Sequence, residues 1–379
     1  MHVPDGFINA PVSAAAGVLA AGAVAVCLRG ARRELDERTA PLGGLVAAFI
    51  FAVQMLNFPV AAGTSGHLLG GALAAILVGP FTGVLCVSVV LLMQGVLFAD
   101  GGLTALGVNI LDMAVVTTVV GYLVFRGLVK VLPRGRRTVT VASFVAALLS
   151  VPAAAVAFTF LYAVGGTTDV SLDKVATAMV GVHLLIGVGE AAITALTVGA
   201  VIAVRPDLVH GARGLTRPLK LRVGGELVDA PAAAEPAGAP ARSRRKVWLA
   251  GLATSLVLAG VVSFYASSNP DGLEKVAQDK GIDKEAEDHA TEDSPLADYG
   301  VKNITDTRVS GGLAGAIGVG VTVVAGSAVL WAVRRRRTGE AGPASTGVDG
   351  ATGATEASGA PGASGVGDAP RASSAPEKA

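Results

Sequence analysis

The first two residues, Met1 and His2, place three nitrogen donors in succession. These are the Met1 amine, the His2 backbone amide and the Nδ1 atom of the His2 imidazole. On one metal ion the first pair closes a five-membered chelate ring and the second pair a six-membered ring, once the amide has lost its proton. Such planar nitrogen sites suit Ni²⁺ or Cu²⁺, and a fourth position stays open. The terminus therefore predicts a metal chelate, against the alternative that a histidine stands at position 2 with no ligand role.

The amine joins this chelate only if Met1 begins the mature chain. Residues 1–6 (MHVPDG) place no positive charge ahead of the first apolar run, so they do not resemble a signal peptide. Removal of methionine usually requires a small second residue, and His2 is bulky. We therefore expect Met1 to be retained with a free amine.

His67 is the candidate for the fourth position. It follows an irregular stretch that contains Pro59, Gly63 and Gly66. Non-helical backbone at membrane depth is tolerated where it lines a cavity or packs on protein, and a metal pocket provides such a cavity. A lone histidine in a loop is more often a surface or packing residue, and that alternative stays open at this point.

Apolar helices must hold these residues in place. Hydrophobic residues make up 52% of the 379 residues and charged residues only 16%, whereas soluble domains average about a quarter charged. A spanning helix needs about 20 apolar residues, and Pro80 favours a break between two adjoining runs. The net charge of +1 argues against nucleic-acid binding. We predict an all-α, polytopic membrane protein with nine apolar runs, at 8–28, 41–58, 68–79, 80–98, 107–131, 138–163, 175–203, 247–265 and 311–333.

The basic residues of the loops fall on one side of this arrangement. With nine crossings and the N terminus outside, every basic cluster becomes cytoplasmic, as the positive-inside rule expects. The clusters lie at 29–38, 130–137, 205–246 and 334–337. Joining the third and fourth runs into one span would put the later clusters on the wrong side. We therefore expect the N terminus outside, on the side of His67, and the C terminus in the cytoplasm.

The chain divides into four predicted parts. Residues 1–205 form a seven-span body and 206–246 a cytoplasmic linker rich in Ala, Pro and Arg. Residues 247–333 form a two-span hairpin with an acidic outer segment at about 266–310. Residues 334–379 are a low-complexity tail of Gly, Ala, Ser and Pro, which cannot bury a core and should be disordered in the cytoplasm.

Ordered motifs in two of these parts resemble known transporter subunits. In residues 1–205 the motifs are MHVPDGF at 1–7, NFPV at 57–60, GTSGHLLGG at 63–71, QGVLFADGGL at 94–103, GVN at 107–109 and HLLIGVGE at 183–190. They resemble the substrate-binding component of cobalt and nickel energy-coupling factor transporters, of the CbiM/NikM type. In the hairpin, PDGLE at 270–274 and SGGLAG at 310–315 resemble the small accessory subunit of the same systems (CbiN/NikN-like), here fused in one chain.

The resemblance implies a ligand set. The Met1 amine, the amide and imidazole of His2 and the imidazole of His67 would bind the metal in a planar arrangement. Four further polar residues are candidates to orient these ligands: Asp5, Ser65, Gln94 and Asn109. For these four, helix capping or interhelical hydrogen bonding is an equally open alternative.

The resemblance also implies the transport reaction and the partners. The chain would capture Co²⁺ or Ni²⁺ outside the plasma membrane, with no permanently bound cofactor, for cobalamin synthesis or nickel enzymes. A transmembrane coupling subunit and two ATPases would drive delivery inward, and the hairpin would help loading by positioning residues 57–67. The sequence contains no GxxxxGK[ST] motif, so ATP hydrolysis is expected on separate subunits and the chain is not expected to be an enzyme.

Two other functions stay open. One is a secondary metal transporter that works without ATPases, for which inverted repeats would be expected and no clear repeat is found. The other is a membrane scaffold or sensor that binds metal without moving it. The sequence does not separate cobalt from nickel, although a planar nitrogen site leans toward nickel.

Asp112, His183 and Glu190 fall inside predicted spans. Ionisable groups there are costly and usually functional. His183 and Glu190 are seven residues apart, so they share one helix face. They suit a release path, a subunit contact or an interhelical structural network, and we favour the structural interpretation. An intramembrane zinc protease has no support, because the pair is not an HExxH site.

Overall fold

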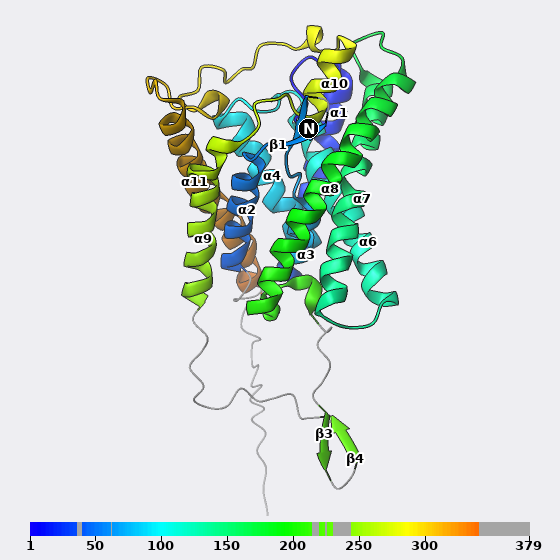
Figure 1. The fold of residues 1–379 in the computed structure, drawn as a ribbon, viewed down its shortest axis with the longest axis vertical. Coiled ribbons are helices and arrows are strands. Elements are labelled where there is room, and N and C mark those ends of the chain that lie inside the picture. The colour runs from blue at the N-terminus through cyan, green and yellow to red at the C-terminus, as the bar shows by residue number, and fades with distance from the viewer. Residues whose placement is uncertain (36–39, 62, 214–219, 224–225, 230–243, 341–379) are drawn as a thin grey trace, which may run out of the picture. The chain divides into compact units, whose positions relative to one another are not determined.

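The computed structural model describes residues 1–340 except 36–39, 62, 214–219, 224–225 and 230–243. The described part is a bundle of long helices with a polar cover at one end (Figure 1). Seven helical segments in it are long and apolar enough to cross a membrane. They are α1 (Ala10–Glu34), α4 (Pro80–Leu97), Leu106–Val131, α7 (Arg136–Gly165), α8 (Leu172–Val204), Arg245–Tyr265 and Thr307–Arg335. The last two lie mainly in α9 (Arg244–Gly260) and in α11 (Thr307–Glu340). The all-helical, multi-pass architecture is therefore confirmed.

The segment Leu106–Val131 is not a uniform α-helix. It consists of α5 (Leu106–Asn109), a π-helical turn η1 (Ile110–Val116) and α6 (Thr117–Val131). Short π-helical turns inside α-helices are frequent at functional sites. Asn109, the last residue of α5, contacts the N-terminal arm, as described below.

Two shorter helices complete the body. α2 (Ala40–Gln54) and α3 (Gly71–Val78) correspond to the second and third apolar runs. At about 1.5 Å per residue α3 is only about 12 Å long, shorter than the hydrocarbon core of a membrane. This run can therefore span the membrane only together with the non-helical residues before it. The break expected at Pro80 is confirmed, because α3 ends at Val78 and α4 begins at Pro80. Between them Gly79 has φ +104°, which a residue with a Cβ rarely adopts.

A small hairpin separates α2 from α3. Strands β1 (Phe58–Ala61) and β2 (Thr64–Gly66) are antiparallel, with Phe58 paired to Gly66. His67 follows directly and is buried. The irregular backbone predicted around residues 57–67 is thus a hairpin that ends at the candidate ligand.

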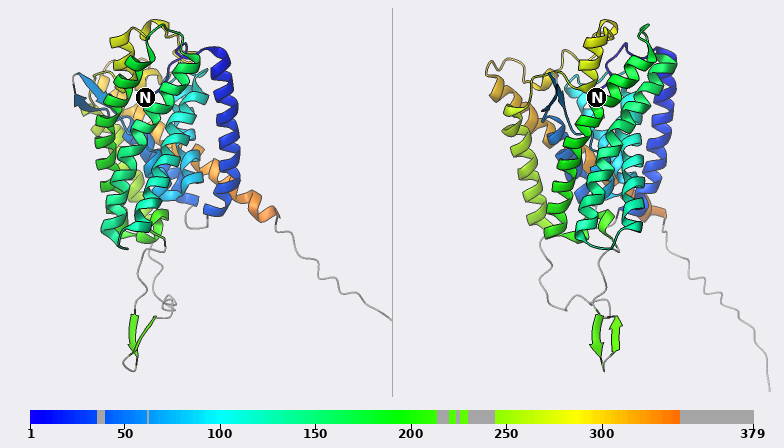
Figure 2. Two further views of the ribbon diagram at one scale, coloured as in Figure 1. Left: turned by 90° about the vertical axis from the view of Figure 1, so that its right-hand side faces the viewer. Right: turned by 45° about the vertical axis from the view of Figure 1, so that its right-hand side comes forward.

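The C-terminal helices lie against one side of the body. α9 and α11 pack on each other and on α2 (Figures 1 and 2). The chain between them forms the polar cover, with η4 (Val262–Tyr265), α10 (Gly272–Lys280), η5 (Asp283–Glu285) and η6 (Ala297–Tyr299). α10 rests on α8 and β2. The acidic outer segment therefore folds over the end of the bundle at which the N terminus lies (Figure 1).

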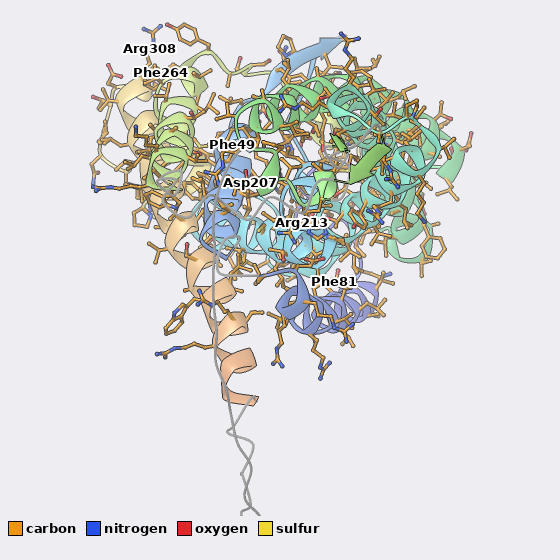
Figure 3. All side chains as sticks on the ribbon, turned by 90° about the horizontal axis from the view of Figure 1, so that it is seen from below. Phe49, Phe81, Asp207, Arg213, Phe264 and Arg308 are labelled. Atoms are coloured by element: carbon orange, nitrogen blue, oxygen red, sulfur yellow. The ribbon has the colours of Figure 1, made fainter. Side chains whose placement is uncertain are left out.

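Small residues bring the helices close together. A Cβ added at Gly30 of α1 would lie 2.4 Å from the ring of Phe81, which Figure 3 shows beside α1. A Cβ at Gly315 of α11 would lie 2.4 Å from the backbone oxygen of Ala259 in α9. Glycine at such crossings lets backbones approach, as is typical of helix packing in lipid.

The two ends of the bundle differ in charge. The C-terminal ends of α1, α6, α8 and α11 lie at the end opposite the N terminus (Figures 1 and 2). The sequence places basic residues at or just beyond these helix ends. This arrangement agrees with the predicted topology, whose orientation in the membrane stays a prediction.

The predicted boundaries differ from the structure in three places. α1 continues to Glu34 and α11 to Glu340, past the predicted ends at residues 28 and 333. Arg and Glu are good helix formers, so a helix continues where the apolar run has ended. The predicted linker also contains structure: η2 (Pro206–Leu208), η3 (His210–Ala212) and strands β3 (Lys220–Val223) and β4 (Glu226–Asp229). The predicted disorder after residue 340 falls outside the described residues.

Candidate metal site

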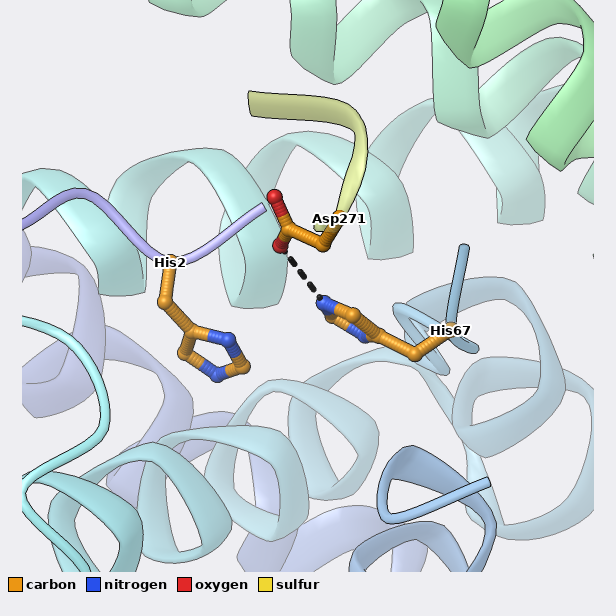
Figure 4. Close-up of side chains that lie close together, drawn as sticks. All are labelled: His2, His67 and Asp271. Atoms are coloured by element: carbon orange, nitrogen blue, oxygen red, sulfur yellow. Dashed lines mark ion pairs between the residues drawn. The ribbon is translucent and has the colours of Figure 1, made fainter. Parts of the chain in front are cut away.

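Three segments that are far apart in sequence meet at one point near the N terminus. His2 comes from the N-terminal arm, His67 from the end of β2 and Asp271 from the start of α10 (Figure 4). One ligand atom of each lies within 4.8 Å of the others. The Met1 amine lies 2.6 Å from His67 Nε2 and 2.5 Å from Asp271 Oδ2. The structure thus brings together the three predicted ligands, and it adds a carboxylate that we had not predicted as a ligand.

Hydrogen bonding selects the nitrogen of His67 that faces the site. The Nδ1 atom lies 3.0 Å from the backbone oxygen of Leu68. A carbonyl oxygen only accepts hydrogen bonds, so Nδ1 carries the hydrogen. The Nε2 atom is left with its lone pair, and it points at the Met1 amine. A neutral imidazole held by its other nitrogen is the usual state of a metal-binding histidine.

The ring of His2 belongs to a closed set of four polar side chains. Its Nε2 lies 3.1 Å from Gln94 Oε1, and its Nδ1 lies 3.3 Å from Asp100 Oδ1. The Tyr299 hydroxyl donates to Asp100 Oδ2 at 2.5 Å and accepts from Gln94 Nε2 at 2.9 Å. Because the Gln94 oxygen accepts the Nε2 hydrogen, a neutral His2 ring keeps its lone pair on Nδ1. This is the nitrogen that the chelate requires.

Burial sets the charge of these groups. Burial lowers the pKa of His2 to about 4, and neighbouring Asp100 offsets only part of this effect. His2 is therefore neutral near pH 7, which is the form that binds metals. Burial by itself would raise the pKa of Asp271, but the Met1 ammonium and His67 bring it well below its ordinary value. The site therefore holds an ionised Asp271 carboxylate near the neutral imidazole of His2.

Two of the predicted orienting residues fix the N-terminal arm. Asn109 accepts from the backbone N–H of Val3 at 2.7 Å and donates to its carbonyl at 3.1 Å. Asp5 accepts from the backbone N–H of Leu103 and from both the N–H and the hydroxyl of Thr104. Both contacts hold the arm just after Met1 and His2, at Val3 and Asp5.

The other two predicted orienting residues act at different places. Gln94 contacts His2 directly, as described above. Ser65 instead contacts the polar cover. Its hydroxyl donates to the Asn269 carbonyl at 2.7 Å, and its backbone N–H donates to the Pro270 carbonyl at 2.8 Å. Ser65 thereby joins β2 to the segment that carries Asp271.

The three intramembrane residues differ in their contacts. Glu190 of α8 accepts from the N–H groups of Leu69 at 2.6 Å and Gly70 at 3.1 Å, where α3 begins. This contact agrees with a structural role. His183 bonds through Nδ1 to the Met179 carbonyl in its own helix, and its buried Nε2 has no hydrogen-bond partner in the described part of the chain. Both Asp112 oxygens likewise lack a partner there, and no role is assigned to this residue.

A cavity of about 530 Å³ adjoins the site. His2, His67 and Asp271 form part of its lining. The lining also includes three further carboxylates, which favour the approach of a cation: Asp100, Glu274 and Asp298.

Sequence reasoning missed Asp271, Asp100 and Tyr299 as parts of the site. The first two stand inside motifs quoted above, but no local pattern placed them near His2 or His67. A signal for Asp271 was present, because Asp271 and Glu274 have the spacing of a helix capping box. The structure confirms this box at the start of α10.

Known proteins match both parts of the chain. Residues 2–208 match the family described as cobalt uptake substrate-specific transmembrane region (CbiM), and residues 245–335 match the PDGLE domain. A putative metal transport protein of Haloquadratum walsbyi is 41% identical over 213 residues, 55% of this chain and 93% of the relative. A putative fused nickel transport protein NikMN of Archaeoglobus fulgidus is 38% identical over 210 residues, 55% of this chain and 68% of the relative. A fused nickel transport protein NikMN of Rhodobacter capsulatus is 32% identical over 278 residues, 72% of this chain and 64% of the relative.

Proposed function

We propose that this chain, which belongs to the CbiM family and carries a fused PDGLE domain, captures Co²⁺ or Ni²⁺ outside the cell for ATP-driven import. As a member of this family it is a multi-pass membrane protein of metal uptake. The captured ion is the transported substrate, held by the Met1 amine, the amide and Nδ1 of His2 and Nε2 of His67.

One observation carries this proposal: the Met1 amine lies 2.6 Å from His67 Nε2, and the rings of His2 and His67 are stacked with centroids 5.1 Å apart. Hydrogen bonds to Gln94 and Leu68 leave the lone pairs on the nitrogens that the chelate needs. The Nδ1 atom of His2 now faces Asp100, so its ring must turn toward the ion on binding.

The energy source belongs to partner subunits in this proposal. The chain works with a transmembrane coupling subunit and two ATPases, which drive the site from outward-facing to inward-facing. The basic helix ends opposite the N terminus suit a cytoplasmic side facing those partners. The PDGLE segment, by which we mean the outer segment of the fused domain at about 266–310, assists loading by holding residues 57–67. Its hydrogen bonds to Ser65 and Asn57 support this role.

Uptake of ⁵⁷Co²⁺ and ⁶³Ni²⁺ tests the transport class and the metal. Cells that lack other importers would express the full chain with or without the coupling subunit and ATPases. We expect uptake only with all partners present. Uptake that persists without ATPases would instead show a secondary transporter, and metal binding without flux in reconstituted vesicles would show a sensor or scaffold.

An N-terminal extension tests the chelate. One added residue converts the Met1 amine into an amide while every side chain remains. Met1 is only 2% exposed, so the added residue also has no space. Loss of a hydrogen bond that orients a metal ligand typically lowers metal affinity about 10–100-fold. We expect loss of the amine ligand itself to lower it at least about 100-fold. Proteolytic removal of a cleavable extension should restore binding, whereas tight binding by the extended protein would refute the chelate.

A further inference from the structure

The geometry points to a further ligand of the transported ion: the carboxylate of Asp271, supplied by the PDGLE segment as an oxygen donor outside the nitrogen plane. This inference rests on the proposed function, because it takes Met1 and His67 as ligands. It gives the fused domain a direct contact with the ion, in addition to any support of residues 57–67.

The distances between donor atoms carry the inference. Met1 N lies 2.6 Å from His67 Nε2 and 2.5 Å from Asp271 Oδ2, and the last two atoms are 3.4 Å apart. Donors bound at about 2.0–2.2 Å lie roughly 2.8–3.1 Å apart at adjacent positions and roughly 4.0–4.4 Å apart at opposite positions. All three distances are closer to the adjacent range than to the opposite range. The three atoms therefore form one triangular face of a coordination shell.

Such a face fixes where Asp271 stands relative to the plane. Among any three positions of a square plane, two are opposite each other. Three mutually adjacent donors therefore cannot all lie in one square plane. Since Met1 and His67 hold neighbouring positions in the plane, Asp271 lies above it, in an axial position.

The local structure aims one oxygen of Asp271 at the site. Oδ1 accepts from the N–H of Glu274 at 2.8 Å, and the Glu274 side chain accepts from the N–H of Asp271 at 3.2 Å, which closes a capping box on α10. Oδ2 is the atom that meets Met1 and His67. The preceding Pro270 carbonyl is held by the Ser65 N–H. The carboxylate is thus positioned before an ion arrives, with one oxygen structural and the other directed at the donors.

Charge balance favours the same arrangement. A divalent ion bound to two neutral imidazoles, a neutral amine and one deprotonated amide carries a net charge of +1, which a carboxylate ligand cancels. The side chains of Met1 and Asp271 are only 1% and 15% exposed, and an unpaired charge at such a place is costly. In the described structure the Met1 ammonium balances Asp271. In the loaded protein the ion takes over that role.

A purely structural role for Asp271 is the alternative to exclude. Asp271→Asn separates a structural role from a ligand role, because asparagine is as good an N-cap residue as aspartate but offers no anionic oxygen to the ion. Asp279→Asn is the matched control. Asp279 stands on the same helix, pairs with Lys275 and is half exposed.

The experiment uses the full chain, purified and loaded with Ni²⁺. The infrared difference spectrum between loaded and metal-free protein should contain shifted carboxylate bands in the wild type and in Asp279→Asn, but not in Asp271→Asn. Ni²⁺ affinity should fall at least about tenfold in Asp271→Asn and stay unchanged in Asp279→Asn.

Each other outcome has a defined meaning. Equal affinity and an identical difference spectrum in wild type and Asp271→Asn would overturn the inference. If Asp271→Asn fails to fold, the wild-type spectrum decides alone, since a spectrum without carboxylate bands also overturns it. A wild-type protein that binds no Ni²⁺ or Co²⁺ would refute the proposed function itself.

Discussion

Replacing Glu190 with glutamine should weaken metal binding, although Glu190 touches no proposed ligand. Its carboxylate accepts from the N–H groups of Leu69 and Gly70, two and three residues after His67. Glutamine keeps one acceptor oxygen, so one buried N–H loses its partner and faces a new amide donor. Two unsatisfied donors cost about 2–6 kcal/mol. Part of this cost is offset, because burying a neutral amide costs less than burying a carboxylate. We therefore expect a destabilisation of about 2 kcal/mol, at the low end of that range.

The chain offers a matched control for this variant in Glu34. Its carboxylate accepts from the N–H groups of Phe81 and Thr82 and from the Thr82 hydroxyl where α4 begins, at the end of the bundle away from the N terminus. Glu34→Gln therefore removes the same kind of contact far from the metal site. We expect it to lower thermal stability to a similar extent and to leave metal affinity unchanged.

Thermal unfolding and Ni²⁺ titration of both variants in detergent make the comparison. We expect Glu190→Gln to lose at least about tenfold in affinity, since about 1.4 kcal/mol corresponds to a factor of ten. Wild-type affinity in Glu190→Gln, despite the lowered stability, would show that the anchoring of residues 69 and 70 does not position His67. An equal loss of affinity in Glu34→Gln would show that the effect is one of general stability.

Two further variants probe the contacts between the PDGLE segment and the body. Tyr299→Phe removes the hydroxyl that donates to Asp100 and accepts from Gln94, so a metal titration should show about tenfold weaker binding. The buried Gln94 amide left without its acceptor should also lower stability by about 1–3 kcal/mol. Gly272→Val should lower stability by about 1–3 kcal/mol, because an added Cβ would lie 2.6 Å from Ile186 of α8. Gly127→Val, where a Cβ has no neighbour within 4 Å, should change the unfolding midpoint far less.

Much of the fold was predictable because apolar runs are local features. Each run produced a helix, and Pro80 marked a break correctly. The ends of α1 and α11 were not predictable from hydropathy, since hydropathy reports burial in lipid whereas helices continue through charged residues. The start of the short α3 depends on Glu190, which lies in α8 more than a hundred residues later. Its carboxylate accepts from the N–H groups of Leu69 and Gly70, just before α3 begins.

The site was predictable only in part. Met1, His2 and His67 come together as the ordered motifs implied, whereas their role as ligands stays a proposal. Asp271 was quoted in a motif, yet nothing in its spacing showed that the carboxylate would reach the Met1 amine. Contacts between a cover segment and a body arise from tertiary docking, which no helix or strand period encodes.

The hydrogen bonds that join the cover to β2 act within a single chain. Docking of the cover therefore depends on an effective local concentration, not on the cellular abundance of a second protein. Each metal site always has one, and only one, Asp271 at hand. If the cover releases, it can rebind without the accessory segment being lost by diffusion, so fusion fixes the stoichiometry of body and cover.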